Sequence, residues 1–171
     1  MASELHIQPL DKTLHNRASF DCGVSALNQY LATQARNDVE SNCCACLVAT
    51  DSPNSKSVMG YYTLSSASIL RTTLSEQLTK KLPRYKELPA TLLGRLAVDI
   101  NYKGQKVGGR LLFSAMRRAF QASEEVASWA LVTDPKDESA RAFYKHFGFL
   151  DLDAQRMFLT MKEVEKCINA Q

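Results

Sequence analysis

The chain has 171 residues, of which 45% are hydrophobic and 23% charged, the balance of an ordinary soluble globular protein. This length fits one domain, so we expect a single domain over residues 1–171. No apolar run approaches the ~20 residues that a membrane-spanning helix needs. The segment Met1 to Leu10 lacks the basic head and apolar stretch of a signal peptide. We therefore expect a cytoplasmic protein without a membrane partner.

The net charge of +3 is only mildly basic, and the five cysteines are an odd number. An odd count without an export signal argues against a disulfide framework. The run Cys43 to Cys46 could suggest a metal site, but no second Cys or His pair accompanies it. We expect these cysteines to be buried in a strand, and we expect no metal.

Hydrophobic periodicity predicts strands in the first half of the chain and strand–helix units in the second. In the first half we expect a strand at 4–9, a helix at 24–38 capped by Asp21 or Ser25, and strands at 44–50 and 57–66. A short helix at 75–81 and an extended linker bracketed by Pro83 and Pro89 follow. In the second half we expect strands at 92–98, 129–133 and 155–161, and helices at 108–122, 137–147 and 162–169. This order predicts an α/β (α+β) fold with a mixed sheet and helices on both faces.

The first chemical feature is the glycine-containing junction between the strand ending at Val98 and the helix starting near Gly108. A helix N-terminus offers unpaired N–H groups and the positive end of its dipole, so it can accept a phosphate. Glycine lets the backbone approach such a ligand closely. A tight turn without any ligand is the alternative reading of the same residues.

The second feature is the helix at 137–147, on which Ala140, Phe143, Tyr144 and Phe147 share one face. Tyr144 can be a packing aromatic with a satisfied hydroxyl. A phenol with a pKa near ~10 is also protonated at neutral pH and can act as a general acid. The nearest carboxylates in the sequence, Asp99 and Glu138, are expected at the surface.

The two features together resemble the GNAT family of N-acetyltransferases. The segment Leu93 to Asp99, followed by Gly104 to Leu112, is similar to the family's motif A. Thr133-Asp134-Pro135, followed by Ala140 to Phe149, is similar to its motif B. The resemblance covers residues 44–161 and implies a central, mostly antiparallel mixed sheet that is splayed in the middle.

The resemblance also implies acetyl-coenzyme A as cosubstrate and Tyr144 as the proton donor to the departing thiolate. Backbone groups of one strand would hold the pantetheine arm, and the turn before the helix would hold the pyrophosphate. The implied cofactor-binding residues are Leu96, Ala97, Val98, Gln105, Lys106, Val107, Gly108, Gly109, Arg110, Ala140 and Phe143. Two of them depart from the family pattern: Lys106 stands where many relatives have glycine, and Arg110 where a small residue is usual.

A narrower resemblance points to the acetyltransferase toxins of bacterial toxin–antitoxin pairs. It is carried by Phe20 to Gly23 with Leu27 to Leu31, and by Leu82 to Asp99. Those toxins acetylate the α-amine of aminoacyl-tRNA and so block translation. The resemblance implies a ribbon–helix–helix antitoxin, operator DNA bound through that antitoxin, and a homodimer.

An RNA substrate needs a cationic path for its backbone. Besides Arg110, the candidate RNA-binding residues are Lys80, Lys81, Arg84, Lys86, Arg117 and Arg118. Two other functions stay open at this point: acetylation of a small amine or a protein N-terminus, and a non-catalytic acyl-coenzyme A-binding module. The basic segments favour the toxin, and Tyr144 disfavours the non-catalytic module.

Overall fold

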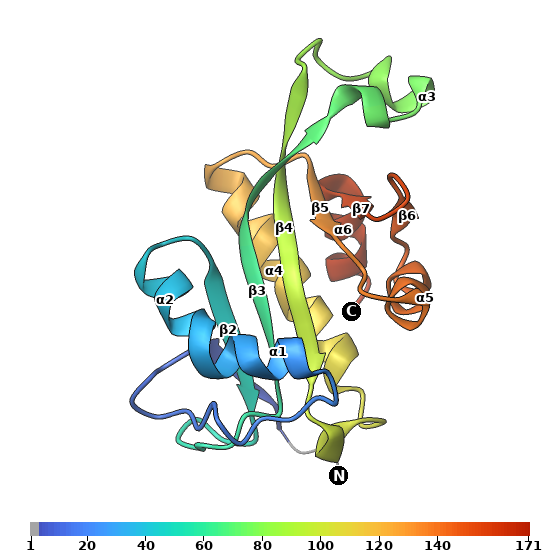
Figure 1. The fold of residues 1–171 in the computed structure, drawn as a ribbon. Coiled ribbons are helices and arrows are strands. Elements are labelled where there is room, and N and C mark those ends of the chain that lie inside the picture. Colours follow the sequence, from blue (N-terminus) through green and yellow to red (C-terminus); the bar gives the residue numbers. More distant parts are fainter. Residues whose placement is uncertain (1–3) are drawn as a thin grey trace. The chain divides into compact units, whose positions relative to one another are not determined.

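The computed structural model describes residues 4–171 and contains a seven-stranded sheet in the order β1-β2-β3-β4-β5-β7-β6 (Figure 1). The strands are β1 (His6–Pro9), β2 (Ala45–Thr50), β3 (Gly60–Leu70), β4 (Glu87–Val98), β5 (Ala130–Thr133), β6 (Leu150–Asp151) and β7 (Met157–Thr160). The helices are α1 (Ser25–Gln29), α2 (Ala35–Glu40), α3 (Glu76–Thr79), α4 (Val107–Glu125), α5 (Glu138–His146) and α6 (Met161–Asn169). The β4–β5 pair is parallel, whereas β1–β2, β2–β3, β5–β7 and β6–β7 are antiparallel, which confirms the predicted mixed, mostly antiparallel sheet.

The chain divides into two compact units. Unit 1 contains the described residues up to Ser65 together with Gly94–Ala115, and unit 2 contains Ser66–Leu93 and Met116–Gln171. The strands β3 and β4 and the helix α4 contribute residues to both. Only Ala90 to Leu93 of β4 pair with β5, and β4 then continues to Val98 within unit 1. The single domain over residues 1–171 stays a prediction.

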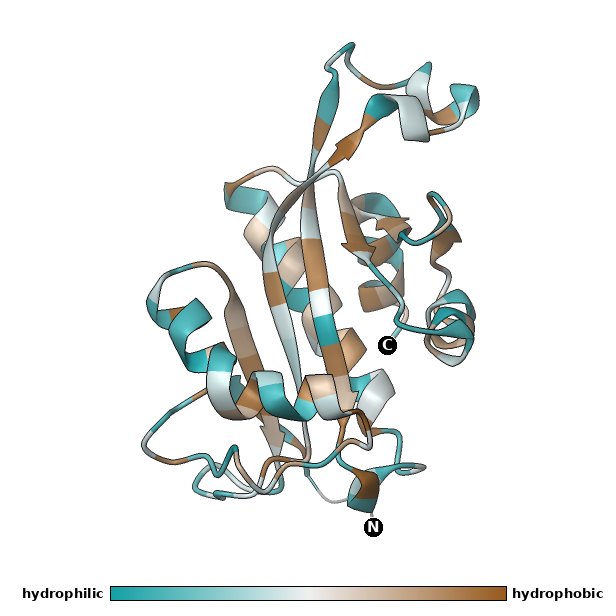
Figure 2. Cartoon of the chain, viewed as in Figure 1, coloured by the Kyte–Doolittle hydropathy of each residue, from teal (hydrophilic) through white to brown (hydrophobic). Residues whose placement is uncertain are grey.

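In unit 1 the predicted helix at 24–38 is a helical run of three parts, because a π-helical segment at Tyr30–Gln34 separates α1 from α2. Its buried face includes Tyr30 and Leu31, which belong to the same core cluster as Phe20 and Tyr61. Figure 2 shows the turns of α2 coloured mainly as hydrophilic, which fits its exposed outer side.

The predicted cap of that helix is wrong. Val24 is the N-cap residue, and it makes no side-chain capping bond. Asp21 instead accepts hydrogen bonds from the Gly23 backbone N–H at 2.8 Å and from the Asn28 side-chain amide at 2.9 Å. The carboxylate therefore closes the loop before the helix rather than capping its first turn.

Gly60 at the start of β3 brings three elements of unit 1 close together. A Cβ at this position would lie 2.7 Å from Leu111 Cδ1 of α4 and 2.8 Å from the Ala97 carbonyl oxygen of β4. Both separations are shorter than any ordinary van der Waals contact. The missing side chain therefore allows α4 and the end of β4 to approach β3.

Unit 2 has its own apolar cluster, formed by Ile69, Ala90, Ala130, Val132 and Phe158. The strand β5 lies at its centre and is coloured hydrophobic in Figure 2. Apolar residues on alternate positions of β5 contribute to this cluster, as expected for one face of a sheet.

Residues 71–86 connect β3 to β4 and form an excursion that we call the arm (Figure 1). Arg71 closes the arm: its backbone N–H donates to the Lys86 carbonyl, and its guanidinium donates to the carbonyls of Thr79, Leu82 and Pro83. One side chain thus holds several backbone oxygens of an otherwise irregular segment.

Several element boundaries differ from the prediction. The strand β4 begins at Glu87, so Pro89 lies within a strand and not at the end of a linker. Its carbonyl accepts from the Trp129 N–H, which a proline can do because only its N–H is missing. The strand β3 runs on to Leu70, and the two-residue strand β6 was not predicted.

The cysteines are free, but the prediction of buried strand cysteines holds only in part. Cys46 is buried in β2, whereas Cys43 is exposed and Cys44 half-buried, and both lie before the strand begins. Within residues 4–171, no group of three or more His, Cys, Asp or Glu residues could hold a metal ion. No helix in the same residues is long and apolar enough to cross a membrane.

Gly60→Ala is expected to lower the free energy of unfolding by about 1–3 kcal/mol, because the new methyl group must displace backbone or core atoms. Urea denaturation followed by circular dichroism measures the loss. Ser66→Ala, an exposed substitution in the same strand, is the control and should change stability by less than about 0.5 kcal/mol. Equal stability of the two variants would contradict the close approach at Gly60.

Candidate active site

The turn between β4 and α4 lies in unit 1 and contains a short 3-10 helix at Ile100–Tyr102. The helix α4 begins at Val107, where the Arg110 N–H donates to the Lys106 carbonyl. Helix geometry leaves the N–H groups of Val107, Gly108 and Gly109 without intrahelical acceptors. These groups, with the positive end of the α4 dipole, can bind an anion. The predicted phosphate-binding residues thus form the start of a 19-residue helix.

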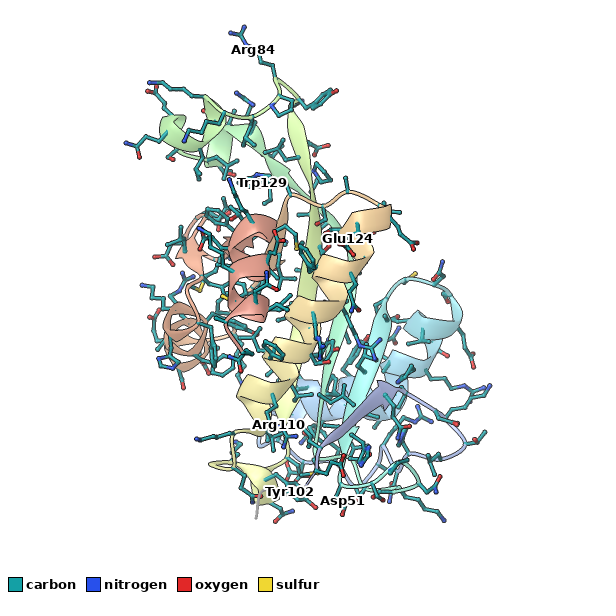
Figure 3. The ribbon with its side chains drawn as sticks, turned by 180° about the vertical axis from the view of Figure 1, so that it is seen from behind. Asp51, Arg84, Tyr102, Arg110, Glu124 and Trp129 are labelled. Carbon is teal, nitrogen blue, oxygen red and sulfur yellow. The ribbon has the colours of Figure 1, made fainter. Side chains whose placement is uncertain are left out.

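Lys106 adopts a left-handed backbone conformation with a φ angle of 62°. Few residues other than glycine take this conformation without a steric cost. This geometry gives a physical reason for glycine at the corresponding position of the GNAT motif that the sequence resembles. The Lys106 side chain is exposed and adds positive charge at this turn. The Arg110 side chain, labelled in Figure 3, is exposed as well and adds a second positive charge.

Asp99 holds the turn in place. The expectation that it lies at the surface is wrong, because its side chain is only 5% exposed. One carboxylate oxygen accepts from the Asp21 N–H at 3.0 Å, and the other accepts from the backbone and side chain of Asn101. Such a buried carboxylate is tolerated because its oxygens are paired.

The loop Asp21 to Gly23 is fastened to the same turn from the other side. The Ile100 N–H donates to the Asp21 carbonyl at 2.8 Å, and Lys103 Nζ donates to the Cys22 carbonyl at 2.9 Å. This contact gives a physical role to the Phe20–Gly23 segment, which the sequence could only match to the toxin group.

Arg95 has a structural role in unit 1. Its guanidinium lies 3.5 Å from the centre of the Tyr30 ring, a cation–π contact. The backbone N–H of Arg95 donates to Thr63 Oγ1. Arg95 is followed in the chain by the three residues that are predicted to hold the pantetheine. Ala97 is buried, and Leu96 and Val98 are half-buried.

Tyr144 lies on α5 in unit 2 and is 6% exposed. Its ring packs against Phe143 and Phe149, with ring centres 5.2 and 5.3 Å away. Burial raises the pKa of Tyr144 above its ordinary value of 10.0, and the neighbouring Thr133 hydroxyl acts in the opposite direction to a smaller extent. The phenol is therefore protonated at neutral pH, as a proton donor must be.

Thr133 is a residue whose role the sequence did not reveal. Its hydroxyl donates to the Leu93 carbonyl at 3.0 Å, where β4 and β5 pair for the last time. This bond fixes the Thr133 hydroxyl, a neighbour of the Tyr144 phenol, against the sheet. The Thr133-Asp134-Pro135 motif was the only available signal, and it carried no information about this contact.

The helix α5 is defined by clear end signals. The Asp137 side chain accepts from the Ala140 N–H at 2.8 Å, and Gly148 has a φ of 94° where the helix ends. Ala140, Phe143 and Phe147 are half-buried beside the buried Tyr144, so the predicted apolar face is confirmed. Glu138 is exposed, as predicted.

Four of the six candidate RNA-binding residues, Lys80, Lys81, Arg84 and Lys86, lie on the arm and are exposed. Figure 3 shows the Arg84 side chain extending away from the arm into solvent. Arg71, which organises this arm, was missed because an isolated arginine between two strands carries no motif. Arg117 and Arg118 are also exposed, but they lie on α4 and not on the arm.

Two curated relatives match nearly the whole chain. A protein named tRNA-acetylating toxin from Mycobacterium tuberculosis is 31% identical over 152 residues, which is 88% of this chain and 89% of the relative. A protein named probable toxin TacT from Sinorhizobium fredii is 26% identical over 172 residues, which is 95% of this chain and 94% of the relative.

Solved structures of toxins share the fold over similar lengths. AtaT complexed with acetyl-methionyl-tRNAfMet is 31% identical with a TM-score of 0.86, covering 95% of this chain and 98% of AtaT. A tyrosine-to-phenylalanine mutant of AtaT, bound to the C-terminus of the antitoxin AtaR and to acetyl-CoA, is 28% identical with a TM-score of 0.81 (95% and 96% covered). The toxin of a KacTA–DNA complex is 27% identical with a TM-score of 0.80 (98% and 100% covered).

The acetyltransferase (GNAT) family matches residues 57–149, a stretch that contains β3, β4, the turn before α4, and Tyr144. More than half of the chain is included. The order of the two motifs, the helix N-terminus and the buried phenol agree with this match. The chain belongs to the GNAT family of acetyltransferases.

Proposed function

We propose that this protein is the toxin of a type II toxin–antitoxin system, which transfers acetyl from acetyl-CoA to the α-amine of aminoacyl-tRNA and so blocks translation. The observation that carries the proposal is the similarity, over 95% of the chain, to AtaT complexed with acetyl-methionyl-tRNAfMet. The identity of 31% to a tRNA-acetylating toxin supports the same substrate. Acetylation of a small amine or of a protein N-terminus becomes the function if charged tRNA is not a substrate.

The residues of unit 1 fit the phosphates of acetyl-CoA. The N–H groups at the start of α4 can donate to the pyrophosphate, and Lys106 and Arg110 supply positive charge. The backbone of Leu96, Ala97 and Val98 extends beyond the pairing with β5, so its polar groups can hold the pantetheine. Ala140 and Phe143 of α5 are proposed to contact the cofactor as well.

Tyr144 is proposed as the general acid. The neutral α-amine attacks the acetyl carbon, so that a C–N bond forms and the C–S bond breaks, and the phenol gives its proton to the departing sulfur. The amine nitrogen then loses one proton, which restores the phenol directly or through water. An α-amine has a pKa near ~8, against ~10.4 for lysine, so a larger share of it is neutral at pH 7. The attacking group therefore needs no strong protein base.

The proposal also includes the partners, the oligomeric state and the location of the toxin. The solved complex of AtaT with the antitoxin AtaR and the KacTA–DNA complex support an antitoxin partner and a DNA-bound state. We propose, from the family resemblance, that the antitoxin is of the ribbon–helix–helix type and that operator DNA is bound through it. A homodimer and a cytoplasmic location complete the proposal. The homodimer follows from family analogy.

Tyr144→Phe is expected to lower kcat on charged tRNA by about 10²–10⁴-fold, the usual range for loss of a general acid. Acetyl-CoA affinity, measured by calorimetry, should stay within about twofold because the ring and its packing remain. Tyr61→Phe is the matched control, since Tyr61 is also buried and its hydroxyl donates to the Leu27 carbonyl at 2.7 Å. Turnover by Tyr144→Phe at the wild-type rate would refute the assignment.

Removing two arm cations with Lys81→Ala and Arg84→Ala is expected to weaken tRNA binding and to flatten its salt dependence. The slope of log K against log salt should fall by about 1.4–1.8, because each phosphate contact contributes about 0.7–0.9. A gel-shift titration at several salt concentrations measures both effects. Lys56→Ala with Lys162→Ala, two exposed lysines outside the arm, provides the charge-matched control. Identical slopes for the two double variants would exclude the arm from the RNA path.

A further inference from the structure

A cavity of about 360 Å³ lies in unit 2, beside the end of β3. Leu70 and Leu152 give it apolar surface, and Thr73 and Gln155, which come from separate segments of unit 2, give it polar groups. Small-molecule sites have this size and this mixture of apolar walls with a few polar groups.

The polar end of the cavity is built from the ion pair between Asp134 and Arg156. The guanidinium donates to both carboxylate oxygens, at 2.9 and 3.2 Å, a bidentate geometry that fixes both side chains. Asp134 directly follows β5, so this end of the cavity is attached to the strand that carries Thr133.

The wall at residues 151–156 is fastened to the helix of the proposed general acid. Arg141 of α5 donates to the carbonyls of Ala154 and Gln155, at 3.0 and 3.2 Å, and forms an ion pair with Asp151. Its side chain is 14% exposed, which distinguishes this pair from a loose surface contact.

Arg141 and Tyr144 are three positions apart on α5, about one helical turn. Thr133, a neighbour of the Tyr144 phenol, immediately precedes Asp134 of the cavity. The same two elements, α5 and the end of β5, thus hold both the phenol and the cavity wall.

We propose that this cavity receives the aminoacyl group of the acceptor substrate, with the amino-acid side chain against Leu70 and Leu152. This assignment rests on the proposed function and adds where the amino acid is selected. The side-chain amide of Gln155 can donate to the ester oxygens of the group, whereas the Thr73 hydroxyl already donates to the Leu70 carbonyl at 2.6 Å and can only accept. The cavity size then limits which aminoacyl groups react.

The test is to fill the cavity from each wall separately. Thr73→Trp and Gln155→Trp should each lower kcat/KM for tryptophanyl- and phenylalanyl-tRNA at least about tenfold more than for glycyl-tRNA, because a filled pocket rejects bulk. Thr72→Trp and Ala154→Trp are the controls: both residues are exposed neighbours that do not line the cavity. If one of the two filling variants misfolds, the other still tests the assignment. Binding of acetyl-CoA shows that a variant is folded.

The controls should leave the ratio between bulky and glycyl substrates as in the wild type. Equal losses on all substrates, or the same ratio in filling and control variants, would overturn the cavity assignment while leaving the proposed function intact. A wild-type protein that acetylates none of the charged tRNAs would refute the proposed function, and the cavity assignment with it.

Discussion

Burial keeps the phenol of Tyr144 protonated, and packing against Phe143 and Phe149 holds its ring in place. The neighbouring Thr133 donates to the Leu93 carbonyl, at the last paired position of β4 and β5. A flexible phenol would transfer a proton inefficiently, because general acids act only within hydrogen-bonding distance. The chemistry proposed for this enzyme therefore depends on the packing that holds one buried phenol in place.

The residues of unit 1 have a different role, which is to present backbone N–H groups to an anion. Gly60 lets α4 approach the sheet, and Asp99 ties the turn before the helix to the loop at Asp21. Lys106 accepts a left-handed backbone conformation in the same turn. An N-terminal helix site binds only if its N–H groups are held in place, so these contacts serve binding.

The sequence predicted the features with local causes. The strand–turn–helix at Val98 to Gly108 and the helix of Tyr144 follow from periodicity and glycine, and their joint order identified the family. Contacts between residues that are far apart in the chain could not be predicted from the sequence. Asp99 looked like a surface carboxylate because its partner, Asp21, lies 78 positions away. Arg71 carried no motif because its acceptors are backbone carbonyls, which every sequence offers. Pro89 suggested a linker, yet it lies in β4, where only its carbonyl is used.

The most direct test of the central claim is transfer of labelled acetyl from acetyl-CoA to total charged tRNA, with deacylated tRNA in parallel. The account predicts label on charged tRNA alone, because only the aminoacyl group offers the low-pKa amine. The label should be lost when the ester is hydrolysed, because it is carried by the amino acid. Label on deacylated tRNA, or no label on any tRNA by a protein that still binds acetyl-CoA, would contradict the account.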